Sequence, residues 1–159
     1  MRRHLPSASK VVDVAAPLPR VIETLLDLDR VAVALGAHAE LVDRTHDVVT
    51  HGSRWTEHRR HAGTTVSRDV AVDAVTPTGY TATCTVGKDR LRYSLRYTVT
   101  RTAEGSRLLG AFEPIGVLEP SSADDPGARP RHPENVFCHL LADDLSAIAH
   151  AAAGPTAED

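Results

Sequence analysis

The segment Leu91–Thr100, with the sequence LRYSLRYTVT, alternates between apolar and polar residues without interruption. A period of two is typical of a β-strand that has one apolar face and one solvated face. Such a strand is not stable alone, because its apolar face must be covered by another layer of structure. The segment therefore predicts a sheet that is packed on one side against helices.

The same period recurs in other short segments, separated by turn sequences such as Thr76-Pro77-Thr78-Gly79. Short strands joined by short turns predict an antiparallel meander. One of these strands contains Gly52, which is a candidate bulge. The predicted strands are Lys10–Val14, Ala39–Thr45, Val49–Arg60, Thr64–Val75, Tyr80–Val86, Leu91–Thr100 and Arg107–Glu113.

Apolar residues at helical spacing predict three helices. The first begins at Pro17, since proline is tolerated in the first turn of a helix. A second short helix follows and ends at Gly36. The third is long, opens at Pro133 and stops at Gly154. The chain is therefore predicted to be an α+β protein, with two short helices after the first strand and a long C-terminal helix.

Composition excludes several classes of protein. A chain of 159 residues with 42% apolar and 25% charged residues fits one globular domain. A net charge of −3 gives no reason to expect a nucleic-acid partner, and no uninterrupted apolar run reaches the ~18 residues of a membrane span. Cys84 and Cys138 stand far apart, which suits a reduced, cytoplasmic chain. Met1–Lys10 lacks the apolar core of a signal peptide. The oligomeric state is not predicted.

We expect one domain over residues 10–153, with flexible ends at 1–9 and 154–159. Inside it, Pro114–Pro133 is rich in proline and polar residues, which is typical of a lid or a disordered loop. As a lid, Ile115–Leu118 would pack against the rim of a cavity while residues 121–131 stay mobile. A passive linker is the alternative, because long loops cost little entropy.

Five segments follow one another along the chain in a characteristic order and spacing: VVDVAAPLPRVIETLLDLD, GSRWTEHRRHAG, VAVDAVTPTGY, RYSLRYTVTRTAEGSRL and NVFCHLLADDLSAIAHA. Together they resemble the START/Bet v 1-like (SRPBCC) superfamily, especially its polyketide cyclase/dehydrase branch. The resemblance implies a helix-grip fold, in which a curved antiparallel sheet wraps around the long C-terminal helix and leaves a cavity between them. The activities that it implies include lipid and hormone binding, polyketide cyclisation or dehydration, and sequestration. Arg30–Gly36 lacks the Trp-x-Pro-like element of many members, so the class of ligand is not carried over.

Two charged residues are candidates for catalysis. Glu57 and Arg59 share one face of their strand with Trp55. If that face is turned inward, the carboxylate and the guanidinium can pair inside the cavity and orient a ligand carbonyl or take part in proton transfer. The alternative is that both charges lie at an open end or edge of the sheet. The basic cluster of Arg54, His58, Arg59, Arg60 and His61 is interpreted as solvated surface, with anion binding as the alternative.

Other candidates would line the cavity. Tyrosines on the inward faces of their strands offer a phenol to a ligand carbonyl or enolate, unless their hydroxyls only reach the rim. The predicted ligand-binding residues are Trp55, Val70, Val72, Tyr80, Cys84, Tyr93, Leu95, Tyr97, Phe112, Phe137, Leu141 and Leu145.

The sequence predicts no metal site and no cofactor, because the histidines lack ligand spacing. It also predicts no covalent nucleophile, because Ser53 and Ser94 sit in no nucleophile elbow and the cysteines lack an evident base.

Three functions remain open. The protein is a binding or sequestration protein for a hydrophobic, aromatic or polyketide-like molecule, a polyketide cyclase or dehydratase, or an assembly module whose cavity is only core. We predict the first, with cyclase or dehydratase chemistry as its enzymatic form.

Overall fold

A computed structural model describes residues 7–61, 63–87, 91–115 and 133–154 of the chain. Strand β1 (Ala8–Val14) is followed by two short helices, α1 (Leu18–Leu25) and α2 (Leu28–Leu35), and by a 3-10 turn, η1 (Gly36–His38). The remaining strands are β2 (Ala39–Val42), β3 (Arg54–His61), β4 (Thr64–Thr76), β5 (Gly79–Val86), β6 (Leu91–Thr102) and β7 (Gly105–Pro114), and the chain then reaches α3 (Pro133–Ala153).

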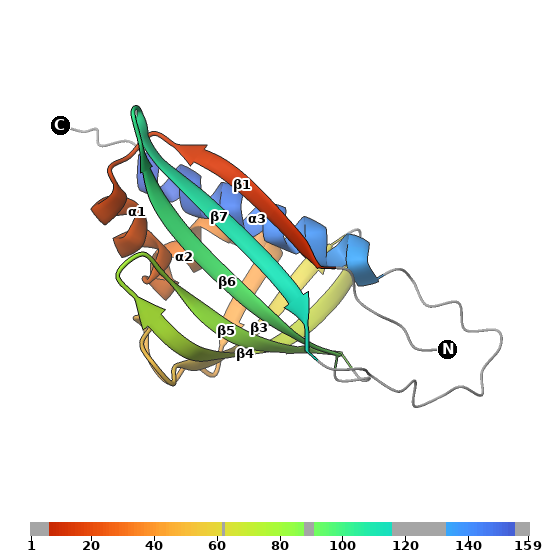
Figure 1. The fold of residues 1–159 in the computed structure, drawn as a ribbon. Coiled ribbons are helices and arrows are strands. Elements are labelled where there is room, and N and C mark those ends of the chain that lie inside the picture. The colour runs from red at the N-terminus through yellow and green to blue at the C-terminus, as the bar shows by residue number, and fades with distance from the viewer. Residues whose placement is uncertain (1–6, 62, 88–90, 116–132, 155–159) are drawn as a thin grey trace, which may run out of the picture.

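All seven strands form one antiparallel sheet in the order β1-β7-β6-β5-β4-β3-β2. The sheet is curled, and α3 runs along its concave side while α1 and α2 close one end (Figure 1). Helix α3 packs against β1, β7, α1 and α2. This is the helix-grip architecture, and it confirms the predicted fold class and order of elements.

The alternation in Leu91–Thr100 has the predicted consequence. In β6, Tyr93, Leu95, Tyr97 and Val99 are each at most 3% exposed, whereas Arg92 and Arg96 are exposed.

By length and composition alone, Val136–Ala153 in α3 is one described segment that could span a membrane. Here its buried residues, among them Leu141 and Leu145, form the core with the inner face of the sheet.

Some predicted boundaries are wrong. β1 begins at Ala8, so it includes residues that were expected in a flexible N-terminus. The strand expected from Val49 begins only at Arg54, because a turn precedes it. Gly52 has a φ of 85° and the Thr50 amide donates to Ser53 Oγ (2.9 Å), so Gly52 belongs to this turn and not to a bulge.

The irregularity in the sheet lies elsewhere, between Val72 and Ala74 of β4. The strand predicted over Ala39–Thr45 ends at Val42, since Asp43 adopts a φ of 54° and turns the chain.

Of the predicted two-part lid, only Ile115 lies within the described residues.

The sheet and α3 approach each other closely at Gly110 of β7. A Cβ atom at this position would lie 2.6 Å from Leu141 Cδ1 and 3.1 Å from Leu145 Cδ2. Contacts this short require the helix or its side chains to move. Gly110 therefore sets the depth at which α3 sits in the sheet.

We expect Gly110→Ala to lower the free energy of unfolding by about 1–3 kcal/mol, because it overpacks this contact. Urea unfolding measures the loss. If the contact with Leu141 is the cause, the double variant Gly110→Ala/Leu141→Ala will lose less than the sum of the two single variants. Strict additivity would contradict this account of Gly110.

Candidate functional site

Four charged side chains lie inside the fold, between the sheet and α3. Glu57 and Arg59 come from β3, Arg68 from β4 and Asp144 from α3, and each is at most 5% exposed. On the strands they occupy the inward parity, next to Trp55 and Val70. We call these four residues the charge network. Glu57 and Arg59 therefore face the interior, and not an open edge of the sheet.

Each arginine in the network binds both carboxylates. Arg59 Nη1 lies 3.0 Å from Glu57 Oε1 and 2.7 Å from Asp144 Oδ1. Arg68 donates from Nε to Glu57 Oε1 (2.9 Å) and from Nη2 to Asp144 Oδ2 (3.0 Å). The two positive and two negative charges balance, and they tie β3 and β4 to the helix.

Aromatic side chains complete the network. Trp55 Nε1 donates to Glu57 Oε2 (2.8 Å), Arg68 Nη1 donates to the Tyr93 hydroxyl (2.8 Å), and the Tyr97 hydroxyl donates to Asp144 Oδ2 (2.9 Å). Within the described residues, every fully buried side-chain nitrogen or oxygen has a hydrogen-bond partner. The hydroxyls of Tyr93 and Tyr97 thus reach the network in the interior and do not end at a rim.

The pairing fixes the charges. Burial alone raises the pKa of Glu57, but Arg68 and Arg59, together with the hydrogen bond from Trp55, lower this pKa to about 2. Burial lowers the pKa of Arg59 and of Arg68, yet the carboxylates around them raise both pKa values above the ordinary arginine value. Glu57 is therefore a carboxylate, and both arginines are cations, across the neutral pH range.

A small cavity borders the network. Its volume is about 20 Å³, which is room for roughly one water molecule. Five of the predicted ligand-binding residues line it: Trp55, Val70, Tyr80, Leu95 and Tyr97. Glu57, Arg68 and Asp144 supply its polar wall, and residues of α1, α2 and β2 close it. The expected cavity is thus filled almost completely by the protein's own side chains.

Tyr80 is the exception among the polar groups around this cavity. It packs edge-on against Tyr97, with 5.3 Å between ring centroids, and is 6% exposed. Its hydroxyl makes no hydrogen bond to a described residue, and Tyr80 is one of the residues that line the cavity. Burial, reinforced by Glu57 and Asp144, raises the pKa of Tyr80, so the phenol keeps its proton.

The other predicted ligand-binding residues lie in the core but do not line the cavity. Tyr93, Phe112 and Phe137 form an aromatic cluster with centroid distances of 4.9–6.1 Å. The remaining four, Val72, Cys84, Leu141 and Leu145, are buried in the main hydrophobic core.

Burial raises the pKa of the Cys84 thiol to about 12, which leaves this thiol a poor nucleophile. Among the residues that the structure describes, no three His, Cys, Asp or Glu side chains are grouped to hold a metal ion.

Sequence reasoning missed Arg68 and Asp144, although both leave a signal. Arg68 shares the parity of Val66, Val70 and Val72, and Asp144 lies on the same helical stripe as Leu141 and Leu145. A charge on an otherwise apolar face is expected to be paired when it is buried. The basic surface cluster was also partly wrong, because Arg59 is buried in the network while Arg54 and Arg60 are exposed.

Comparison with known proteins identifies the fold. No family model and no curated protein sequence matches the chain. Among solved structures, protein Ms6760 from Mycobacterium smegmatis has a TM-score of 0.68 at 17% identity, and the match covers 100% of this chain and 97% of that one. Ara h 8.0201 has a TM-score of 0.65 at 12% identity, covering 94% of this chain and 99% of that one.

A third similar structure is the di-domain ARO/CYC StfQ from the steffimycin biosynthetic pathway. It has a TM-score of 0.67 at 13% identity, and the match covers 92% of this chain but 48% of StfQ. The predicted resemblance is confirmed, since the structural neighbours include Bet v 1-like/SRPBCC proteins. At these identities the likeness establishes the fold alone.

The network makes a first prediction about paired charges. Arg68→Met leaves Glu57 and Asp144 buried with only Arg59 between them, and we expect a loss of about 3–5 kcal/mol in the free energy of unfolding. The double variant Glu57→Gln/Arg68→Met removes one charge of each sign and should recover much of this loss. Chemical denaturation of the three proteins measures the difference. Equal free energies of unfolding in the wild type, Arg68→Met and the double variant would contradict the pairing.

A second prediction concerns acid stability. The pKa of Glu57 is about 2 in the folded protein against an ordinary value of 4.5, so its contribution is complete above pH 4.5 and is lost as the pH falls toward 2. The shift corresponds to about 3 kcal/mol. Unfolding measured from pH 6 to pH 2 should show a shallower loss of stability in Glu57→Gln than in the wild type. Parallel curves would mean that Glu57 has an ordinary pKa.

Proposed function

We propose that this protein binds a hydrophobic small molecule, of the aromatic or polyketide type, between the inner face of the sheet and α3. The observation that carries the proposal is Tyr80, which lines an interior cavity and whose hydroxyl makes no hydrogen bond to a described residue, beside a network whose fully buried, described side-chain atoms are all partnered. In an apolar interior, a lone phenol is suited to donate a hydrogen bond to a ligand carbonyl.

The cost of the charge network supports a functional role. Burying two arginines and two carboxylates requires a large desolvation energy, and apolar side chains of similar volume commonly give equal or greater stability. Clusters of buried charges with displaced pKa values beside a cavity are therefore candidates for a functional site. The network presents a rigid, polarised wall to whatever occupies the cavity.

Binding requires the interior to expand. A volume of about 20 Å³ is far below the ~300 Å³ or more of a usual small-molecule site. The wall most suited to move is the pair of short helices, because α1 and α2 are each eight residues long and contribute Leu25, Leu28, Val31 and Leu35 to the cavity. We expect these helices to shift outward while the sheet and α3 keep their places.

The protonation states favour binding over proton transfer. Glu57 is held as a carboxylate with a pKa of about 2, and burial raises the pKa values of Tyr80, Tyr93 and Tyr97, so none of these groups exchanges a proton readily near neutral pH. In the enzymatic form of the proposal, a cyclase or dehydratase, Tyr80 and Arg68 would stabilise a developing enolate by hydrogen bonding and charge. StfQ, a structural neighbour described as an ARO/CYC protein, supports this form by its fold alone.

The small cavity also supports a second candidate function. If the space between sheet and helix never opens, the network is a set of structural ties and the protein is an assembly or interaction module. The complete pairing of the fully buried side-chain atoms that the structure describes is consistent with that role.

Two matched ligands separate these functions. We expect neutral 2-acetylnaphthalene, which carries a carbonyl, to bind with a micromolar Kd and to raise the Tm by mass action. Tyr80→Phe should weaken this binding by about 3–10-fold, the effect of one hydrogen bond, while 2-ethylnaphthalene, which has no carbonyl, should bind both proteins equally.

Tyr93→Phe is the control, because the Tyr93 hydroxyl does not line the cavity. Tyr93→Phe removes the hydroxyl that accepts a hydrogen bond from Arg68, so it should lower the free energy of unfolding. It should leave the ratio of the affinities for 2-acetylnaphthalene and 2-ethylnaphthalene unchanged. If neither compound shifts the Tm at saturating concentration, the interior site is rejected and the assembly function is favoured.

A further inference from the structure

We propose that the groove between the end of β3 and α3 is a second binding site, which takes an aromatic carboxylate. This β3–α3 groove has a volume of about 440 Å³, within the usual range for small-molecule sites, and it is open in this structure. Its polar lining residues are His38, Arg59, Arg60, His61, Asp143 and Ser146. The inference does not depend on the interior site, because the groove needs no movement to admit a ligand.

Arg59 supplies the carboxylate contact. Its side chain is 2% exposed, and its Nη1 is held by Glu57 and Asp144. Its Nε and Nη2 make no hydrogen bond to a described residue, and they are not among the fully buried atoms, while the residue itself lines the groove. The edge formed by Nε and Nη2 has the spacing that binds both oxygens of a carboxylate.

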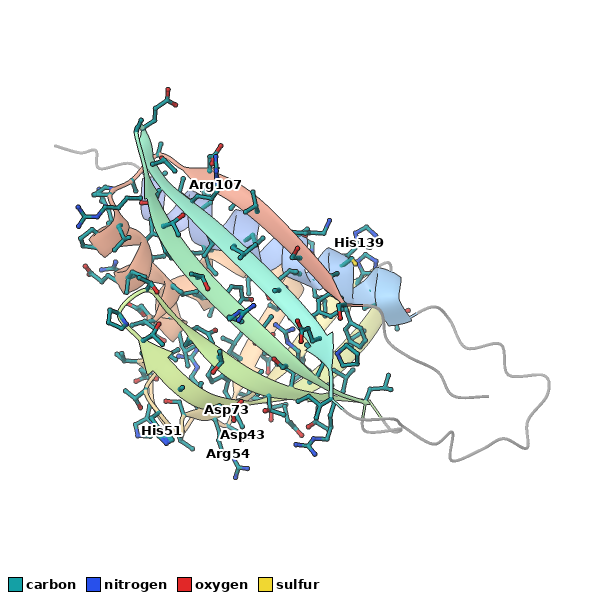
Figure 2. The ribbon with its side chains drawn as sticks, viewed as in Figure 1. Asp43, His51, Arg54, Asp73, Arg107 and His139 are labelled. Carbon is teal, nitrogen blue, oxygen red and sulfur yellow. The ribbon has the colours of Figure 1, made fainter. Side chains whose placement is uncertain are left out.

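The ring of the ligand has a flat surface to pack against. His61 lines the groove, and it stacks on His139 of α3 with 4.7 Å between ring centroids and 28° between the ring planes. Figure 2 shows His139 toward the N-terminal end of α3. A planar aromatic ring can extend this stack while its carboxylate reaches Arg59.

The remaining charges of the groove set its selectivity. Arg60 attracts a carboxylate, and the exposed carboxylate of Asp143 repels one. Asp144 lies beneath the groove but is neutralised by Arg59 and Arg68. Among the described residues of the groove, Asp143 is thus the one negative group that has no positively charged partner. Removing its charge should strengthen the binding of an aromatic carboxylate.

The experiment is a titration with 2-naphthoate, followed by calorimetry and by backbone amide NMR. We expect the NMR signals of the His38, His61 and Ser146 amides to shift when 2-naphthoate binds. Asp143→Asn should bind 2-naphthoate a few-fold tighter than the wild type. Arg59→Lys keeps the positive charge but loses the two donors that bind both carboxylate oxygens, so it should bind about tenfold weaker. Arg54→Lys is the matched control, since Arg54 points away from the fold (Figure 2), and its affinity should equal that of the wild type.

The outcomes distinguish this site from the interior one. Failure of 2-naphthoate to shift the groove amides, or equal affinity in the wild type and Asp143→Asn, would overturn the proposal. Competition between 2-naphthoate and neutral 2-acetylnaphthalene would overturn it as well, because it would place both compounds in the interior. Independent binding of the two compounds is the expected result, and Asp143→Asn keeps this test valid even if Arg59→Lys fails to fold.

Discussion

The pairing of Arg68 with Glu57 and Asp144 is the interaction on which the inner structure depends. It joins two strands to the one long helix through bonds of 2.9 and 3.0 Å, at a depth where an unpaired charge would cost several kcal/mol. Arg59 repeats the same two contacts from the neighbouring strand. The carboxylates are therefore fixed in both charge and position, which gives the interior a polar wall that its apolar surroundings alone would not provide.

The neutral balance of the network also explains how the protein can present two different surfaces. Toward the interior, all four charges are compensated, and the Tyr80 phenol lines the cavity without a hydrogen bond to a described residue, which suits an uncharged ligand oxygen. Toward the β3–α3 groove, Arg59 has Nε and Nη2 without a hydrogen bond to a described residue, and we infer that this edge receives an anion. In these two proposals, Arg59 separates the proposed site for neutral carbonyl compounds from the proposed site for carboxylates.

Much of the fold could be predicted from the sequence, because the alternation of Leu91–Thr100 and the apolar stripe of Phe137–Ile148 each specify one element and one buried face. The errors fall where local geometry decides, as at Gly52, where a turn replaces the expected start of β3. The site was less predictable. The parity of Glu57 and Arg59 left a buried pair and an exposed edge both open, and their partner Asp144 lies 76 residues beyond Arg68. The close contact of Leu141 with β7 at Gly110, where a Cβ atom would lie 2.6 Å from Leu141 Cδ1, is likewise stated by no sequence pattern.

The most direct test of the interior site is a crystal structure of the protein with a neutral aromatic ketone. We expect the ketone between the sheet and α3, with its carbonyl oxygen about 2.7–2.8 Å from the Tyr80 hydroxyl. We also expect α1 and α2 to be displaced while the Arg68–Asp144 pair stays intact. A ketone bound elsewhere on the protein, with the interior cavity unchanged at about 20 Å³, would contradict the proposed interior site.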